Sequence, residues 1–312
     1  MDGQLPQRVH EYRNHHLDST RWDGYSVRDD DVVITTAYKA GTTWTQRIMA
    51  SLILGPGPLY ADLWEISPWV DARFFGPVEV MLERLDAQHH RRFVKSHLAA
   101  DGVRFFPEAK YIVVGRDTRD VFMSMYNHYS AFTDVAYAGF NDPDRPGPEL
   151  PRCPESPREL WPRWIAEGWF DWEPDGWPWW SHSHHTATWW DVRDLPNVLL
   201  VHYGDLKADT ETEMRRIAAF CGIAVEDDAW PDLVASVGFE AMRNEARDGT
   251  SPLGVVLEGG VDRFYYQGTN GRWRDVLTDD DLAQYDRAAA ANLDPELRHW
   301  LEHGREGREI SS

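Results

Sequence analysis

The fold is decided by DVVITTAYKAGTTW, residues 31–44, in which a short apolar run leads through a tight turn into a helical pattern. A strand, a turn and a helix start in this order leave backbone N–H groups unpaired at the positive end of the helix dipole, where anions bind. Lys39 adds a full positive charge, and Thr42 and Thr43 add hydroxyl donors. The sequence therefore predicts a phosphate-binding turn after the first core strand.

The order of residues in this turn separates it from the common nucleotide-triphosphate loop. In that loop glycine comes before lysine, and serine or threonine follows the lysine directly. Here Lys39 precedes Gly41, and the aromatic residue Trp44 closes the motif. This inversion points away from ATP and GTP.

Four short apolar runs predict buried strands at residues 31–36, 92–96, 110–115 and 197–203. Helical spacing follows at residues 42–54, 77–90, 118–131 and 209–221. Strands that alternate with helices indicate a parallel sheet covered on both faces, with ligands at the carboxyl ends of the strands. We expect a P-loop-like, three-layer α/β fold in one domain over residues 1–312, with a core from about 31 to 285.

Composition narrows the classes of partner. The formal charge of −20 argues against general affinity for nucleic acid or anionic membranes, so a polyanionic ligand needs a local basic pocket. The two cysteines show neither a disulfide framework nor metal-ligand spacing. The sequence shows no secretory signal and no apolar stretch of about 18 residues, so we expect a cytoplasmic protein without a membrane span.

Two further strand ends carry polar residues suited to a phosphate site. Arg116 follows the run 110–115, and Ser124 lies about two turns into the next helix, so the two could hold one phosphate. An arginine followed by aspartate here is equally typical of a structural ion pair. His97 ends the run 92–96 beside Lys95, where it is placed to act as a base, although a lone histidine is more often structural.

A fourth segment, QGTNGRWR at residues 267–274, combines two glycines with Arg272 and Arg274. It reads either as a donor-rich turn for an anion or as an ordinary loop before a helix capped by Thr278.

Taken together, these segments resemble the cytosolic-type sulfotransferases, including bacterial members, that use 3′-phosphoadenosine 5′-phosphosulfate (PAPS). The order and spacing hold from about residue 31 to 285. The matching motifs are AYKAGTTW (37–44), KSH (95–97), RDTRDVFMS (116–124), YGDLK (203–207), FEAMRNE (239–245) and GTNGRWR (268–274).

The resemblance implies roles for these residues. His97 takes the proton from the acceptor, and Lys39 and Lys95 offset negative charge during transfer. No metal is implied, and PAP, the bisphosphate left after transfer, is the product. The implied cofactor contacts are Lys39, Ala40, Gly41, Thr42 and Thr43 to the 5′-phosphosulfate, Arg116 and Ser124 to the 3′-phosphate, Trp44, Tyr203 and Phe239 around adenine, and Arg263, Gln267, Gly268 and Arg272 in or just before the last motif.

Several positions depart from the family pattern. Tyr38 and Ala40 stand where the family has proline and serine, so one hydroxyl that restrains the lysine is lost. Tyr266 and Gln267 replace a basic pair, which leaves Arg263 or Arg272 to complete the 3′-phosphate contact.

The acceptor is expected to be a small molecule with a hydroxyl, phenol or amine. An aromatic group at Trp64, Trp69, Phe74 and Phe75 suggests an apolar pocket for it. The tryptophan-rich stretch 161–190 is interpreted mainly as packing, and residues 133–157 as either a lid or a flexible insertion. His15 and His16 are interpreted as surface residues, and a metal site at His182, His184 and His185 as improbable.

Two other functions stay open on the sequence alone. A P-loop-type kinase would need a carboxylate for Mg²⁺, and only Asp117 offers itself. A nucleotide-binding module that has lost its chemistry is the second. The sequence does not decide between a monomer and a homodimer.

Overall fold

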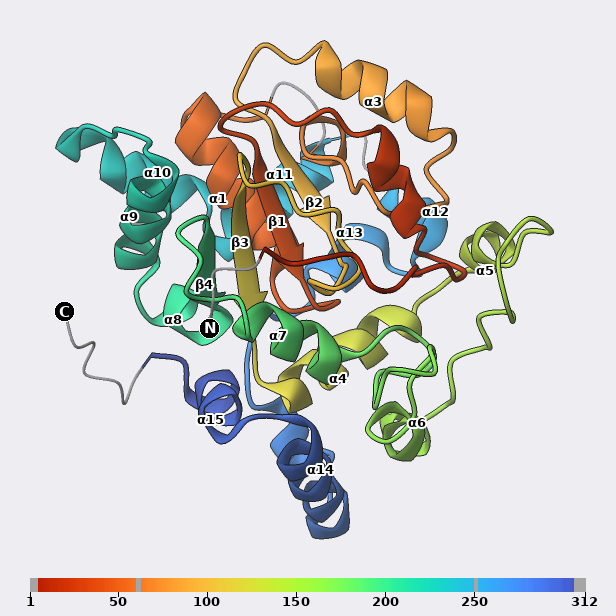
Figure 1. The fold of residues 1–312 in the computed structure, drawn as a ribbon. Coiled ribbons are helices and arrows are strands. Elements are labelled where there is room, and N and C mark those ends of the chain that lie inside the picture. Colours follow the sequence, from red (N-terminus) through yellow and green to blue (C-terminus); the bar gives the residue numbers. More distant parts are fainter. Residues whose placement is uncertain (1–4, 60–62, 250–251, 306–312) are drawn as a thin grey trace.

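The protein is described from a computed structural model that covers residues 5–59, 63–249 and 252–305. Its centre is a parallel sheet of four strands in the order β2-β1-β3-β4 (Figure 1). The strands are β1 (Val32–Thr36), β2 (Phe93–Ser96), β3 (Lys110–Gly115) and β4 (Val198–His202). Each falls inside a run that the sequence analysis assigned to a strand, and the predicted parallel α/β class is confirmed.

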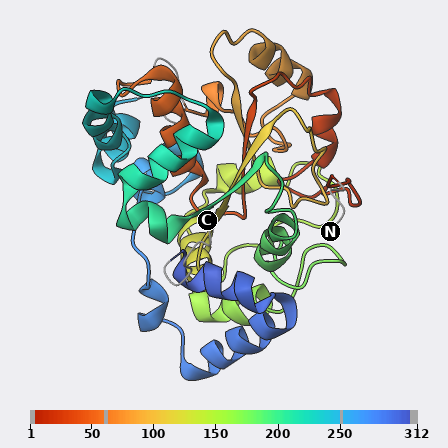
Figure 2. The same ribbon diagram turned by 60° about the vertical axis from the view of Figure 1, so that its left-hand side comes forward.

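Helices and short 3₁₀ turns connect the strands and cover the sheet (Figures 1 and 2). In chain order they are η1 (Ser19–Gly24), α1 (Thr42–Leu54), α2 (Leu63–Ile66), α3 (Val78–Asp86), α4 (Thr118–Tyr129), α5 (Asp134–Phe140), α6 (Pro157–Trp164), α7 (His182–Trp190), α8 (Tyr203–Ala208), α9 (Thr210–Cys221), η2 (Asp227–Ala229), α10 (Trp230–Ser236), α11 (Phe239–Asp248), α12 (Leu253–Val256), α13 (Gly260–Phe264), η3 (Arg272–Asp275), α14 (Asp279–Asn292) and α15 (Pro295–His303).

The sheet is buried on both faces, which explains why its strands read as continuous apolar runs. Alternate residues of β1 point to opposite sides. Val32 and Ile34 pack in one core with side chains of α1, α9 and α10, whereas Val33 packs in a second core with Phe122 of α4 and Trp189 of α7. The sheet therefore forms the middle of three layers.

Local signals explain where the helices around the site begin. Gly41 precedes α1 with a φ of 128°, a backbone conformation that strongly favours glycine. Asp117 caps α4 because its side chain accepts from the backbone N–H of Arg119. The helix predicted over residues 77–90 is shorter, α3, because Pro77 stands at its N-cap and the helix ends at Asp86.

The region 133–157, which the sequence analysis interpreted as a lid or a flexible insertion, opens with a helix, α5. The side chain of Thr133 caps this helix by accepting from the N–H of Ala136. The proline-rich part that follows is tied at Asn141, whose amide exchanges hydrogen bonds of 2.7 and 3.0 Å with the backbone of Leu150. A role for this region as a lid stays a prediction.

His15 and His16 contradict the prediction that they lie at the surface. Both side chains are fully buried, and Nε2 of His15 donates to the carbonyl of Pro178 over 2.8 Å. The ring of His16 stacks on Phe140 with 3.9 Å between ring centres. The segment that carries them has no helical or strand period, so its burial beneath the tryptophan-rich stretch leaves no pattern in the sequence.

The tryptophan-rich stretch packs as predicted, with the side chains of Trp161, Trp164, Trp179, Trp180, Trp189 and Trp190 buried. Within the described part of the chain, no helix combines the length and the apolar character that crossing a membrane requires.

Gly115, the last residue of β3, supports a first prediction. A Cβ atom there would lie 2.2 Å from the ring of Trp300 on α15. We expect Gly115→Ala to lower the free energy of unfolding by about 1–3 kcal/mol, because an overpacked core must shift. Urea unfolding followed by fluorescence measures the change.

Gly139→Ala is the matched control, because Gly139 is exposed on α5 and an added Cβ would meet nothing within 4 Å. This substitution should leave the urea midpoint unchanged or raise it. Equal midpoints for the two variants would show that the packing of Trp300 on Gly115 does not constrain the fold.

Candidate active site

A cavity of about 350 Å³ lies at the carboxyl ends of β1, β2 and β3. Loops from these strand ends supply its floor, and α4, α11 and the segment 264–272 supply its walls. Its volume is within the usual range for small-molecule sites. Parallel strands with their carboxyl ends on one edge bring together residues that lie more than 200 positions apart in the sequence.

The cavity is strongly basic although the whole chain is acidic. Five cationic side chains line it: Lys39, Lys95, Arg116, Lys207 and Arg272. None of the described residues that line it carries a carboxylate. In a chain with a formal charge of −20, this separation of charge indicates a site for a polyanion.

The lysine of the first loop is held in an unusual backbone conformation. Lys39 has a φ of 65°, and its Nζ lies 4.6 Å from the centre of the Phe264 ring. Burial and then the charge of Lys95 lower the pKa of Lys39 to about 7. Burial also lowers the pKa of Lys95 to about 8, while its Nζ lies 4.4 Å from the centre of the Trp69 ring.

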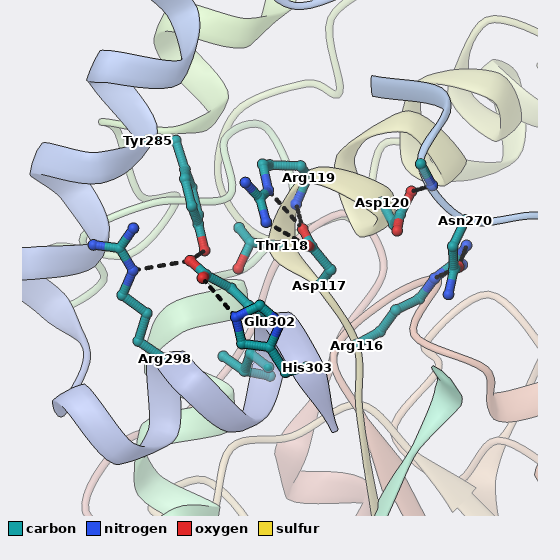
Figure 3. A network of polar contacts seen from close by, with 12 residues as sticks. Arg116, Asp117, Thr118, Arg119, Asp120, Asn270, Tyr285, Arg298, Glu302 and His303 are labelled. Carbon is teal, nitrogen blue, oxygen red and sulfur yellow. Dashed lines mark hydrogen bonds and ion pairs between the residues drawn. The ribbon is translucent and has the colours of Figure 1, made fainter. Parts of the chain in front are cut away.

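Arg116 joins the first loop, residues 37–41 between β1 and α1, to the last loop, residues 265–271 between α13 and η3. Its Nη1 donates to the carbonyl of Lys39 over 3.2 Å. Its Nη2 donates to Oδ1 of Asn270 over 2.8 Å (Figure 3). The guanidinium also lies 4.1 Å from the centre of the Tyr203 ring. Beside it, Asp120 accepts from the N–H of Gly271 over 2.7 Å. The two loops that border the cavity are thus fixed to each other.

The sequence left open whether Arg116 forms a structural ion pair with Asp117. Figure 3 shows that Asp117 points to Arg119 instead, with 2.6 Å between Nη2 and Oδ2. Arg119 lies between the rings of Trp273 and Tyr285, at 4.2 and 4.6 Å. Asp117 therefore serves the start of α4, and Arg116 lines the cavity.

His97 lies at the end of β2 with one ring nitrogen fixed. Nδ1 donates to the carbonyl of Thr36 over 2.7 Å, since a carbonyl oxygen can only accept. Nε2 then carries the lone pair, and it is buried without a hydrogen-bond partner among the described residues. Burial and the charge of Lys95 hold the pKa of His97 well below its ordinary value. The ring is neutral at pH 7 and can accept a proton at Nε2.

Most residues singled out from the sequence meet in this cavity. They are Lys39, Gly41, Thr42, Thr43, Trp44, Lys95, His97, Arg116, Ser124, Tyr203, Phe239, Gln267, Gly268 and Arg272.

Ala40 and Arg263 are not among the lining residues. Ala40 is fully buried, and its N–H donates to the carbonyl of Ala37 over 3.3 Å. The guanidinium of Arg263 donates to Asn127 and Ser130 at 3.0 and 2.8 Å.

Other lining residues were missed by the sequence analysis, although some had a visible signal. Asn127 and His128 lie three and four positions after Ser124 on α4, which places all three on one face of the helix. Lys207 belongs to the motif YGDLK, but the sequence analysis gave it no role. Its Nζ donates to the carbonyl of Gly268 over 2.5 Å. Tyr38 was noted only as a departure from the family.

Two groups of residues that the sequence analysis considered as possible sites do not line the cavity. Within the described ranges, no cluster of histidine, cysteine or carboxylate side chains is arranged to hold a metal ion, and His184 pairs with Asp101 at 2.8 Å. The aromatic group at Trp64, Trp69, Phe74 and Phe75 contacts the cavity indirectly, because Trp69 packs edge-on against His97 with 4.7 Å between ring centres.

Comparisons with known proteins agree with this geometry. The family described as "Sulfotransferase domain" matches residues 29–295. The chain is 32% identical to a glycolipid sulfotransferase of Mycobacterium bovis, with 95% of each chain covered. It is 26% identical to human sulfotransferase 2A1, with 89% of this chain and 90% of the relative covered.

Solved structures share the fold at lower identity. A mouse sulfotransferase complexed with PAP aligns with a TM-score of 0.63 at 17% identity, covering 90% of this chain and 91% of the other. Retinol dehydratase in complex with androsterone and PAP aligns with a TM-score of 0.67 at 19% identity, covering 88% and 84%.

The fold and the extent of the family match define the class of this protein as a sulfotransferase. The chain belongs to the sulfotransferase domain family, whose match covers most of its length. Within that family it is a PAPS-dependent enzyme.

Proposed function

We propose that this enzyme moves the sulfuryl group of PAPS to a hydroxyl, phenol or amine of a small acceptor, with His97 as the general base. One observation carries the proposal: a cavity with five cations and no lining carboxylate among the described residues leads to a neutral, buried imidazole. The cations suit the cofactor, and the unpartnered Nε2 suits an acceptor proton.

The first loop would hold the 5′-phosphosulfate. The backbone N–H groups at the start of α1 face the cavity with the hydroxyls of Thr42 and Thr43, and Lys39 adds charge. Adenine would lie among Trp44, Tyr203 and Phe239. Gly268 allows the last loop to approach Phe239, because an added Cβ would lie 2.8 Å from that ring.

The 3′-phosphate would lie between Arg116, Ser124 and Arg272. Burial and then the charge of Arg116 lower the pKa of Arg272. An anion between the two guanidinium groups would relieve their repulsion. Arg263 is a poorer candidate, because it lies outside the cavity lining, whereas Arg116 and Arg272 line the cavity.

In the proposed step the acceptor oxygen or nitrogen attacks sulfur while Nε2 of His97 takes its proton. The bond from sulfur to the bridging phosphate oxygen breaks, and the products are the sulfated acceptor and PAP. Lys39 and Lys95 would offset negative charge on the transferred group and the leaving phosphate. This chemistry relies on cations of the chain and needs no metal.

An apolar part of the acceptor is supported by the aromatic rings around His97. Trp69, Tyr38 and Trp180 lie at 4.7, 5.1 and 5.6 Å between ring centres. The relatives named glycolipid sulfotransferases make an acceptor with both a hydroxyl and an apolar part a reasonable choice. The kinase hypothesis is disfavoured, because Asp117 pairs with Arg119 and lies outside the cavity lining.

His97→Ala tests the assignment of the base. We expect turnover to fall at least about 100-fold, because positioned proton transfer typically contributes 10²–10⁴-fold. The affinity for PAP should stay nearly constant. Transfer of radiolabelled sulfate from PAPS to a panel of phenols, alcohols, amines and glycosides measures turnover, and calorimetry measures PAP binding.

His184→Ala serves as the matched histidine control, since His184 pairs with Asp101 outside the cavity lining. Turnover of His97→Ala equal to that of this control would refute His97 as the base.

Arg272 and Arg263 form a matched pair for the 3′-phosphate. We expect Arg272→Met to weaken PAP about 10-fold to 100-fold, because charged hydrogen bonds contribute about 1.5–3 kcal/mol. Binding of 5′-AMP, which lacks the 3′-phosphate, should change little. Arg263→Met should keep the preference for PAP over AMP. Calorimetric titrations give all four affinities, and loss of the preference in Arg263→Met alone would reverse the assignment.

The lowered pKa of Lys39 predicts a pH dependence of cofactor binding. Below pH 7 its ammonium is charged in the empty site, and above pH 7 it becomes neutral. PAP favours the charged form, so its affinity should fall as pH rises from 7 to 9 and its binding should take up protons. Calorimetry in buffers of different ionisation enthalpy measures the uptake. Lys39→Arg keeps its charge over this range and should reduce the uptake, and unchanged uptake would contradict the assignment.

A further inference from the structure

Tyr38 and His128 form a polar pair in the wall of the cavity, beside His97. The hydroxyl of Tyr38 lies 3.1 Å from Nε2 of His128, and both residues line the cavity. The Tyr38 ring lies between two imidazoles, with 5.1 Å to the centre of His97 and 5.7 Å to that of His128. The Tyr38 ring therefore packs against both the proposed base and its own hydrogen-bond partner.

This pair has unused hydrogen-bonding capacity. Nδ1 of His128 is buried and has no partner among the described residues. Burial and the charge of Lys39 hold the pKa of His128 well below its ordinary value, so the ring is neutral. Buried polar atoms are nearly always paired in proteins, so an unpaired one in a cavity wall calls for an explanation.

The chemistry of the pair selects one kind of partner. If the Tyr38 hydroxyl donates to Nε2, His128 keeps a donor at Nδ1 and Tyr38 keeps oxygen lone pairs. If Nε2 donates to Tyr38, His128 keeps a lone pair at Nδ1 and Tyr38 keeps its hydroxyl proton. Either tautomer offers one donor and one acceptor, which matches a hydroxyl group because a hydroxyl both donates and accepts.

We propose that Tyr38 and His128 bind a second hydroxyl of the acceptor, and that the natural acceptor is therefore polyhydroxylated, of the sugar class. The proposal rests on the proposed function, in which His97 receives the proton of the first hydroxyl. An aromatic ring beside the pair would contact the apolar face of a sugar ring: Phe264 lines the cavity, and its ring centre lies 5.9 Å from that of His128.

A purely apolar acceptor would form no hydrogen bond with Tyr38 or His128. Such a ligand would leave Nδ1 of His128 unpaired, as it is in the empty site, whereas a ligand hydroxyl that pairs with it gains a hydrogen bond. A site built to hydrogen-bond a hydroxyl discriminates strongly against an analogue that lacks it. The pair would thus act as the element that selects the acceptor, while the cations act on the cofactor.

The test compares two probes that share a phenyl group and an aliphatic hydroxyl: phenyl β-D-glucopyranoside and 2-phenylethanol. Each is titrated by calorimetry into the protein saturated with PAP. We expect the glucoside to bind at least about tenfold more tightly than the alcohol to the unaltered protein. Tyr38→Phe and His128→Phe should each remove most of this preference, because each keeps a ring and loses the polar atom.

Tyr126→Phe is the matched control on α4, because its hydroxyl donates to the carbonyl of Glu155 over 2.7 Å and it lies outside the cavity lining. It should keep the full preference. Thermal unfolding with and without PAP establishes that each variant is folded and binds the cofactor product. Failure of PAP to stabilise the unaltered protein would overturn the proposed function itself.

With PAP bound, three results would overturn the proposal for the acceptor alone. They are equal or tighter binding of the alcohol, no detectable binding of the glucoside, and a preference that survives in both variants of the pair.

Discussion

The structure depends on holding several cations close together at a cavity wall whose described residues include no carboxylate. Arg116 makes this possible, because its guanidinium donates to the backbone of the first loop at Lys39 and to Asn270 in the last loop. Burial and mutual repulsion penalise each charge, as the lowered pKa values of Lys39 and Arg272 show. A polyanionic ligand removes the repulsion, so ligand binding and local stability are coupled in this fold.

The parallel sheet explains why these groups meet. The order β2-β1-β3 places the loop after β1 between the end of β2, which carries Lys95 and His97, and the end of β3, which leads to Arg116. The last loop reaches the same edge through its bonds to Arg116 and Asp120. A shift of any one strand by a residue would turn its end residues to the other face. The arrangement of the residues around the cavity is thus a consequence of strand order and register.

Regular patterns in the sequence predicted the sheet and the flanking helices, because each rests on a local signal such as an apolar run or a helix cap. The same patterns pointed to Lys39, His97 and Arg116 at strand ends, whereas Trp44, Tyr203 and Phe239 were singled out only through the resemblance to sulfotransferases. The same signals could not show that Arg263 is held by Asn127 and Ser130, since that contact joins residues far apart in the chain. Nor could they show the burial of His16, which depends on packing against Phe140 in a segment without period. The Tyr38–His128 pair was equally invisible, although the position of His128 one turn after Ser124 was readable.

The cations around the cavity have a second consequence, which concerns His97, the proposed base. The pKa of His97 is lowered by burial and also by Lys95 and Lys39, so the positive field that suits the cofactor also keeps the imidazole unprotonated. When an anionic cofactor offsets that field, the pKa of His97 must rise toward its ordinary value. Its proton affinity therefore increases only after the sulfuryl donor is bound. In the proposed mechanism, the empty site holds a weak base, and the loaded site holds a stronger one.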